Sequence, residues 1–220
     1  MGTVVAWDLK GTVVTGSEEA RASAFNRYLE GAGYAGRVTP EQIERAGYGW
    51  RARMNTLTPD FTPTEKALET LDRLQREEIP KYVKTVPGAL AALRSVGKKN
   101  SVIVSTSGRN LIAEYLRAAK LEGRFEKVYS VLDDALPAGI GRDMVLAEDI
   151  PAYKAVLFRR VVADFPRARV IAVGDRNGDR RAAREAGIDF VHAKDIDSIE
   201  RTTELYFTRQ LPIGVQAARA

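Results

Sequence analysis

The sequence predicts a doubly wound α/β fold, a parallel sheet with helices on both faces, that carries an inserted α-helical cap. Three short apolar runs predict the strands: residues 3–7, 101–104 and 169–173. Each run ends in small or polar residues, and the last two lead into helical patterns at 110–119 and 180–186. Strand, turn and helix in that order form the repeating unit of an open parallel sheet.

The insertion is predicted from a change in spacing, because residues 15–84 contain helical patterns and no strand run. Its two apolar faces are Ala24, Phe25, Tyr28 and Leu29, and Ala67, Leu68, Leu71 and Leu74. Thr64 offers a helix start before residues 65–76, and helices are also expected at 89–96 and 155–163. We therefore expect a core domain of residues 1–14 and 85–220, with residues 15–84 as the cap.

Composition excludes several classes of protein. A chain of 220 residues with 45% hydrophobic residues can bury a real core, which excludes a disordered chain. The absence of cysteine excludes disulfide frameworks, thiolate metal sites and cysteine nucleophiles. Acids and bases are interspersed around a net charge of +5, so we expect no nucleic-acid partner. No long apolar segment or signal-peptide pattern occurs, so we expect a cytoplasmic protein without a membrane partner.

The polar turns after the three apolar runs carry the candidate site. Ligands of an open parallel sheet bind outside the carboxyl ends of its strands, so these turns should meet. Asp8 follows the first run, and Asp175 and Asp179 follow the third. Carboxylate oxygens are preferred ligands of Mg²⁺. The sequence therefore predicts that the three aspartates share one divalent ion.

Four segments resemble the motifs of the haloacid dehalogenase superfamily, in the order found in that family. They are VVAWDLKGTV, VIVSTSGRN, Lys154 and VIAVGDRNGD. The position of the insertion, with KTVPGALAALRSVG after it, is similar to the helical-cap branch, to which phosphoglycolate phosphatases and β-phosphoglucomutases belong. The resemblance implies a Mg²⁺-dependent hydrolase of a small phosphorylated metabolite, acting as a monomer or homodimer.

The resemblance also implies roles for the residues around the strand ends. Asp8 is the implied nucleophile, which forms an aspartyl phosphate, and a simple turn aspartate is the alternative. The backbone N–H groups of Gly11 and Thr12 are expected to face the phosphoryl oxygens. Asp175 and Asp179 are the implied Mg²⁺ ligands, although Asp179 could also be only a helix N-cap.

Two further roles leave alternatives open. Ser105 resembles the hydroxyl that hydrogen-bonds the transferring phosphoryl group, but Thr106 could fill that role, and a plain helix cap is the third option. Lys154 resembles the lysine that balances charge between nucleophile and phosphate. Lys127 or Arg142 could replace it, and a surface lysine is the remaining interpretation.

Lys10 departs from the family pattern. The phosphatases have a second aspartate there, which protonates the leaving oxygen and then activates water. A lysine could do this only if its pKa fell from about 10.4 toward neutrality. We expect the neighbouring aspartates to raise this pKa instead and keep the ammonium charged. The ammonium would then pair with Asp8 and compete with Mg²⁺. The backbone C=O of Lys10 could still bind the ion.

Lys10 therefore keeps a second function class open, a phosphate-binding or interaction protein with impaired turnover. The 2-haloacid dehalogenases and the phosphonatases also lack this acid and are minor alternatives. Dehalogenases usually have an altered acidic motif, whereas Asp175 and Asp179 are both present here.

Within the insertion, the segment AGYGWRARM is the candidate for substrate selection. Arg51 or Arg53 could hold a second carboxylate or phosphate through bidentate hydrogen bonds. The alternative is a helix junction with Trp50 buried and both arginines in water. Trp7 and His192 are expected to be structural, and residues 205–220 could form an edge helix or an oligomer contact.

Overall fold

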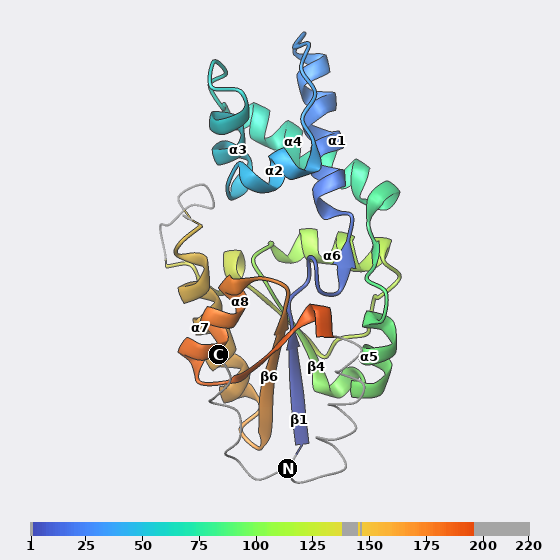
Figure 1. The fold of residues 1–220 in the computed structure, drawn as a ribbon, viewed down its shortest axis with the longest axis vertical. Helices are drawn as coiled ribbons and strands as arrows, with labels where there is room; N and C mark the ends of the chain where they lie inside the picture. The colour runs from blue at the N-terminus through green and yellow to red at the C-terminus, as the bar shows by residue number, and fades with distance from the viewer. Residues whose placement is uncertain (1, 138–144, 146, 196–220) are drawn as a thin grey trace.

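The structure, a computed structural model, describes residues 2–137, 145 and 147–195. A five-stranded parallel sheet has helices on both faces, and four more helices lie beyond the carboxyl ends of its strands (Figure 1). The predicted doubly wound α/β fold is therefore confirmed. Two predictions, Arg142 and the tail at residues 205–220, fall outside the described residues.

The sheet has the strand order β5-β4-β1-β6-β7, with every neighbouring pair parallel. Trp7, at the end of β1, lies opposite Ile103 on one side and Val173 on the other, so three strands end close together. The strands are β1 (Gly2–Trp7), β4 (Ser101–Ser105), β5 (Lys127–Ser130), β6 (Ala168–Gly174) and β7 (Asp189–His192). The apolar runs predicted β1, β4 and β6, but not the edge strands β5 and β7.

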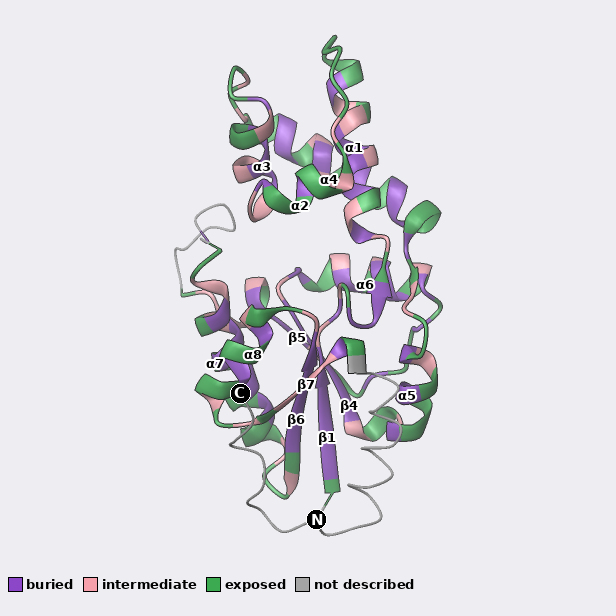
Figure 2. Ribbon diagram, in the orientation of Figure 1, coloured by how far each residue is buried: buried purple, intermediate pink, exposed green. Residues whose placement is uncertain are grey.

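Side chains of β1 alternate between two hydrophobic cores, as the period of a strand requires. Val5 and Trp7 pack with α5 (Ala89–Val96) and α6 (Arg109–Ala118). Val4 and Ala6 pack with α7 (Ile150–Asp164) and α8 (Asn177–Ala186). Trp7 is fully buried, as predicted for a core residue at the end of the strand. Figure 2 shows this burial along the strands and on the inward helix faces.

Four helices occupy the segment for which the sequence predicts a cap, and they pack around a third hydrophobic core. This core contains the predicted faces of the first and last helix, for example Phe25 and Leu71. Thr64 caps the last helix by accepting a hydrogen bond from the N–H of Ala67 at 3.2 Å, as expected. The helices are α1 (Ser17–Gly31), α2 (Pro40–Arg45), α3 (Gly49–Leu57) and α4 (Glu65–Tyr82).

The two chain segments that join these helices to the sheet lie side by side. Short strands β2 (Val14–Thr15) and β3 (Lys84–Thr85) pair antiparallel at this point. Gly16 has a φ of +83°, and a Cβ atom on it would lie 2.1 Å from the carbonyl oxygen of Tyr82. Only glycine tolerates both this conformation and this close approach.

Short helical turns complete the described chain: η1 (Lys98–Asn100), η2 (Val131–Ala135) and η4 (Ala193–Asp195). Among the described helices, none is long and apolar enough to cross a membrane.

Candidate active site

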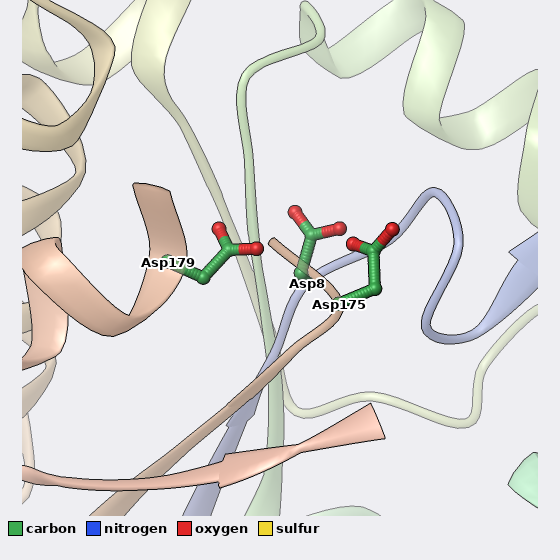
Figure 3. A group of neighbouring side chains, drawn as sticks. All are labelled: Asp8, Asp175 and Asp179. Carbon is green, nitrogen blue, oxygen red and sulfur yellow. The ribbon is translucent and has the colours of Figure 1, made fainter. Parts of the chain in front are cut away.

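Three aspartates converge at the carboxyl end of the sheet, and we call them the acidic cluster: Asp8, Asp175 and Asp179. Each offers a carboxylate oxygen, and these oxygens lie within 4.8 Å of one another (Figure 3). Asp8 follows β1 and Asp175 follows the neighbouring strand β6, while Asp179 lies in the first turn of α8. The predicted convergence is thus confirmed.

Glycines allow these loops to approach one another. Gly11 has a φ of +80°, and a Cβ atom on it would lie 2.2 Å from an oxygen of Asp175. A Cβ atom on Gly174 would lie 2.6 Å from the Cβ of Asp179. The N–H of Gly11 donates to the C=O of Val14 at 2.8 Å, because the loop turns tightly here. The expectation that this N–H faces a phosphoryl group is therefore wrong.

Lys154 links two members of the acidic cluster. Its Nζ lies 2.5 Å from an oxygen of Asp8 and also donates to Asp179, and the residue is 3% exposed. Burial acts to lower the pKa of Lys154, but Asp179 and Asp8 raise it above its ordinary value. The surface interpretation of Lys154 is wrong. The alternative Lys127 instead forms an exposed ion pair with Asp164 at 2.9 Å.

The acidic cluster fits a divalent cation. Burial raises the pKa of Asp8 to about 6, against the effect of Lys154, and the charges of Asp179 and Asp175 add to this rise. Burial also raises the pKa of Asp175. Its Oδ1 is buried and has no hydrogen-bond partner in the described part of the chain. Three close carboxylates with one lysine therefore leave negative charge and a free oxygen, the donor set that Mg²⁺ prefers.

Asp179 also has a local structural role. It is the third residue of α8, and its Oδ2 accepts a hydrogen bond from the N–H of Arg176 at 3.2 Å. The helix begins after Arg176, so Asp179 is not the N-cap that the sequence offered as an alternative. One carboxylate thus stabilises the helix start and belongs to the acidic cluster.

The second motif brings hydroxyl and carbonyl groups to the same strand ends. Ser105 is fully buried, and its Oγ accepts a hydrogen bond from the N–H of Ser107 at 3.2 Å. The N-cap of α6 is Gly108, so Ser105 is not a helix cap. The C=O of Thr106 accepts a hydrogen bond from the hydroxyl of Tyr48 in the cap. Thr12 Oγ1 is buried without a hydrogen-bond partner among the residues described.

Lys10 does not behave as the sequence predicted. Its Nζ forms no hydrogen bond or ion pair within the described residues, and the lysine that pairs with Asp8 is Lys154 instead. Burial lowers the pKa of Lys10 well below its ordinary value. Arg21 and Arg53 lower this pKa further, whereas Glu18 and Asp8 raise it. The expected rise was wrong because burial and two cap arginines outweigh the attraction of Asp8.

Lys10, Arg21 and Arg53 form a second charged group, which we call the basic cluster. Glu18 is its counter-charge and pairs with Arg21 at 2.5 Å. Arg21 is 4% exposed and also donates to the hydroxyl of Tyr115 in α6 at 3.5 Å. Arg21 and Glu18 were missed from the sequence because they belong to no motif.

Arg53 and Arg51 have different surroundings although they lie two residues apart on α3. Arg53 is 8% exposed, its guanidinium carbon lies 5.6 Å from the ring centroid of Trp50, and its Nε donates to the C=O of Ile43 at 3.2 Å. Arg51 donates to the C=O of Pro63 and pairs with Glu65 at 2.6 Å. Trp50 is buried as the alternative expected, but the expectation that both arginines lie in water is wrong.

Two contacts between described residues join the cap to loops at the carboxyl ends of the strands. One is the hydrogen bond from Tyr48 to Thr106, and the other is an exposed ion pair between Glu44 of α2 and Arg176, which directly follows Asp175, at 3.1 Å. The cap therefore lies over the carboxyl ends of the strands, as Figure 1 shows.

Comparison with known proteins gives two kinds of match. A family model described as haloacid dehalogenase-like hydrolase matches residues 3–187. Among curated proteins, no sequence matches this chain. The solved structures that are similar include a candidate β-phosphoglucomutase from Thermotoga maritima, at 18% identity and a TM-score of 0.67, covering 92% of this chain and 99% of that one.

Two other similar structures have comparable scores. CbbY from Rhodobacter sphaeroides, in complex with phosphate, has 17% identity and a TM-score of 0.63, covering 87% of this chain and 86% of that one. A predicted phosphoglycolate phosphatase from Haemophilus somnus has 17% identity and a TM-score of 0.64, covering 87% and 84%. These identities support the fold alone, whereas the family model spans the cap and the whole acidic cluster. This chain therefore belongs to the haloacid dehalogenase-like hydrolases.

Proposed function

We propose that this protein is a Mg²⁺-dependent hydrolase of phosphate esters, which acts on a small phosphorylated metabolite through an aspartyl phosphate on Asp8. The observation that carries the proposal is the acidic cluster, three carboxylates within 4.8 Å with Lys154 bound to two of them. The phosphate in the similar CbbY structure is in accord with it.

The chemistry assigned to this chain has two steps. A carboxylate oxygen of Asp8 attacks phosphorus, the ester P–O bond breaks, and the leaving oxygen takes a proton from solvent water to become the alcohol. Water then attacks the phosphorus of the aspartyl phosphate, which releases inorganic phosphate and restores Asp8. Lys154 orients Asp8 through its 2.5 Å contact and offsets negative charge on the phosphoryl oxygens.

Hydroxyl groups from two loops complete the phosphoryl site. Ser105 accepts a hydrogen bond from Ser107, which leaves its hydroxyl proton to donate to a phosphoryl oxygen. The buried Thr12 hydroxyl is a second donor, and Thr106 remains an alternative to Ser105.

The acidic cluster would hold the metal. Asp8, Asp175 and Asp179 would bind Mg²⁺ through carboxylate oxygens, and Lys10 would add its backbone C=O. When bound, Mg²⁺ neutralises charge on the phosphoryl group and helps to orient it.

A second candidate function is phosphate binding with impaired turnover, and Lys10 is the observation that favours it. The acid that the family's phosphatases use is absent at this position, and no hydrogen bond to a described residue fixes the Lys10 side chain in its place. The two candidates share a ligand and differ in whether the ester bond breaks.

The test compares the natural protein with Asp8→Asn and Lys10→Asp on a panel of phosphate esters, with Mg²⁺ and with EDTA. We expect the natural protein to release phosphate in Mg²⁺ and not in EDTA. In Asp8→Asn, kcat should fall by on the order of 10⁴-fold or more. If Lys10→Asp releases phosphate and the natural protein does not, the hydrolase proposal is contradicted and the phosphate-binding function is favoured.

Metal binding has its own readout, the melting temperature. Mg²⁺ at about 100 times its dissociation constant should stabilise the protein by about 2.7 kcal/mol. Asp175→Asn should lose most of this stabilisation, whereas the control Asp189→Asn should keep it, because the Asp189 side chain is 54% exposed and pairs with Arg169. Equal Mg²⁺ stabilisation in both variants would contradict the metal assignment.

A further inference from the structure

We propose that Ser130, which lies outside the four motifs, is a positioning residue for the phosphoryl contact of Ser105. The inference rests on the proposed function, because that function assigns a phosphoryl oxygen to the Ser105 hydroxyl. Ser130 ends β5 and lies directly opposite Ser105, which ends the neighbouring strand β4. Both residues are fully buried. Ser130 acts through the loop that follows Ser105 and not on the substrate itself.

The loop that follows Ser105 is held by serine side chains. The ladder between β4 and β5 ends at Ser105 and Ser130, so buried backbone groups beyond this point need other partners. The Ser130 hydroxyl donates to the C=O of Ser107 at 2.9 Å, and the N–H of Ser107 donates to the Ser105 hydroxyl oxygen at 3.2 Å. Hydroxyl groups on two neighbouring strands thus hold both backbone groups of Ser107.

The backbone donors determine the direction of each hydrogen bond in this series. The Ser130 hydroxyl oxygen accepts a hydrogen bond from the N–H of Asp133 at 3.1 Å, and its single proton goes to Ser107. The Ser105 oxygen also accepts from an N–H, which leaves its proton for a group outside the series. A phosphoryl group at Asp8 would receive that proton. Ser130 therefore helps to determine where the Ser105 hydroxyl points.

The segment that follows Ser130 holds the same loop at a second point. A carboxylate oxygen of Asp133 accepts a hydrogen bond from the N–H of Arg109 at 2.7 Å. The Arg109 guanidinium pairs with Asp134 at 2.6 Å, and Asp134 in turn accepts a hydrogen bond from the N–H of Ser130 at 2.8 Å. These contacts join the start of α6 to η2 and fix the position of Ser130 relative to residues 107–109.

A purely local role for Ser130 would need only one of its two hydroxyl contacts. Ser130 is the N-cap of η2, and this cap requires only that its oxygen accept from the N–H of Asp133. The donation to Ser107 adds nothing to that cap, and it connects η2 to the loop after a different strand. This second contact is therefore the observation that favours positioning over capping alone.

The experiment is a double-mutant cycle between Ser105 and Ser130, with p-nitrophenyl phosphate as the substrate and Mg²⁺ present. Ser130→Ala should lower kcat/KM about tenfold, and Ser130→Thr should retain most of the activity because it keeps the hydroxyl. In the Ser105→Ala background, Ser130→Ala should change kcat/KM less than about twofold, since the hydroxyl that it orients is gone. No loss in Ser130→Ala, or a similar loss in both backgrounds, would overturn the proposal.

Ser101→Ala is the matched control. Ser101 is also fully buried, begins β4, and donates through its hydroxyl to the C=O of Gly97 at 3.0 Å. Its replacement removes the same kind of hydrogen bond at the opposite end of the strand, so kcat/KM should stay within about twofold of the natural value. A loss equal to that of Ser130→Ala would overturn the proposal. If Ser130→Ala does not fold, as circular dichroism would reveal, Ser130→Cys replaces it, because a thiol is a weak donor.

Binding of inorganic phosphate in Mg²⁺, measured by calorimetry, separates this inference from the proposed function. Ser130→Ala should raise the dissociation constant about tenfold, but not when Ser105→Ala is already present, whether or not any ester is turned over. This result without turnover by the natural protein would contradict the hydrolase and support the positioning role. Turnover by the natural protein, with equal phosphate affinity and equal kcat/KM in Ser130→Ala, would support the hydrolase and overturn the positioning role. A natural protein that neither binds phosphate nor hydrolyses an ester would contradict both.

Discussion

The acidic and basic clusters have opposite charge arrangements. In the acidic cluster, three carboxylates surround one cation, Lys154, whose pKa is raised above its ordinary value. In the basic cluster, three cations surround one carboxylate, Glu18, whose pKa is about 2. The groups that share the prevailing charge of their cluster have pKa values shifted toward the neutral form. The pKa of Asp8 is raised to about 6, and the pKa of Lys10 is lowered.

This comparison shows that local charge, rather than the mildly positive total, determines the electrostatic environment of each cluster. Each cluster has two more charges of one sign than of the other, counting every side chain as ionised. Mg²⁺ has the charge that would neutralise the acidic cluster, and an anion would neutralise the basic one. Replacing the single residue of opposite charge in each cluster, Lys154 or Glu18, is therefore the most direct test of this comparison.

Replacing Lys154 should have the largest effect on stability. Lys154→Met leaves Asp8 and Asp179 without their buried cation, so the free energy of unfolding in EDTA should fall by about 3 to 5 kcal/mol. Urea unfolding measures this loss, and Mg²⁺ should recover part of it. Lys127→Met is the control, because its exposed pair with Asp164 should contribute less than about 1 kcal/mol. If the free energy of unfolding falls by less than about 1 kcal/mol in both variants, the buried charge of Lys154 does not stabilise the acidic cluster.

Replacing Glu18 tests the other cluster through pH. Burial acts to raise the pKa of Glu18, but Arg21, Lys10 and Arg53 lower it from 4.5 to about 2. A lowered pKa stabilises the folded protein above pH 4.5, and this stabilisation is lost as pH falls toward 2. Glu18→Gln should therefore lower the free energy of unfolding by about 3 kcal/mol at pH 7 and by less than half of that at pH 3.

Urea unfolding at both pH values checks this prediction for Glu18. The matched control is Glu65→Gln, since Glu65 is 78% exposed and pairs with Arg51 at the surface of the cap. Its effect should stay below about 1 kcal/mol. A loss in Glu18→Gln that is independent of pH would assign Glu18 a packing role instead of a charge role.

Removing the hydrogen bond between Tyr48 of the cap and the C=O of Thr106 should have the smallest effect on stability. Tyr48→Phe removes the hydrogen bond to the C=O of Thr106, which should lower the free energy of unfolding by about 1 kcal/mol. With a turned-over ester, KM should rise about fivefold at most while kcat stays within a factor of about two. Tyr34→Phe is the control, because Tyr34 is 42% exposed. A larger fall in kcat than rise in KM would contradict a role limited to holding the cap.

The parts of the fold that could be predicted are those that local patterns specify. Continuous apolar runs indicated the three central strands, because both faces of those strands are buried. The edge strands β5 and β7 are short and partly exposed, so their pattern is weak. The acidic cluster could be predicted because Asp8 and Asp175 directly follow strands and Asp179 lies in the first turn of a helix.

The basic cluster could not be predicted, because packing across the cap boundary brings together residues 10, 21 and 53. Arg51 and Arg53 illustrate the difficulty. Residues two apart on a helix point about 200° from each other, so one of them faces inward, but the sequence did not specify which. The pKa of Lys10 was predicted in the wrong direction for the same reason, since neither its burial nor its arginine neighbours are visible in a linear sequence.

The pairing of β2 with β3 has a consequence for how this protein could diverge. Because Gly16 contacts the Tyr82 backbone, the four-helix segment leaves and rejoins the core at nearly one point. Such a segment is a modular attachment, which can be lengthened, shortened or exchanged without altering the register of the central strands. Chimeras that carry a foreign segment between these two residues should therefore retain the sheet and the acidic cluster, which circular dichroism and the Mg²⁺-dependent rise in melting temperature would check.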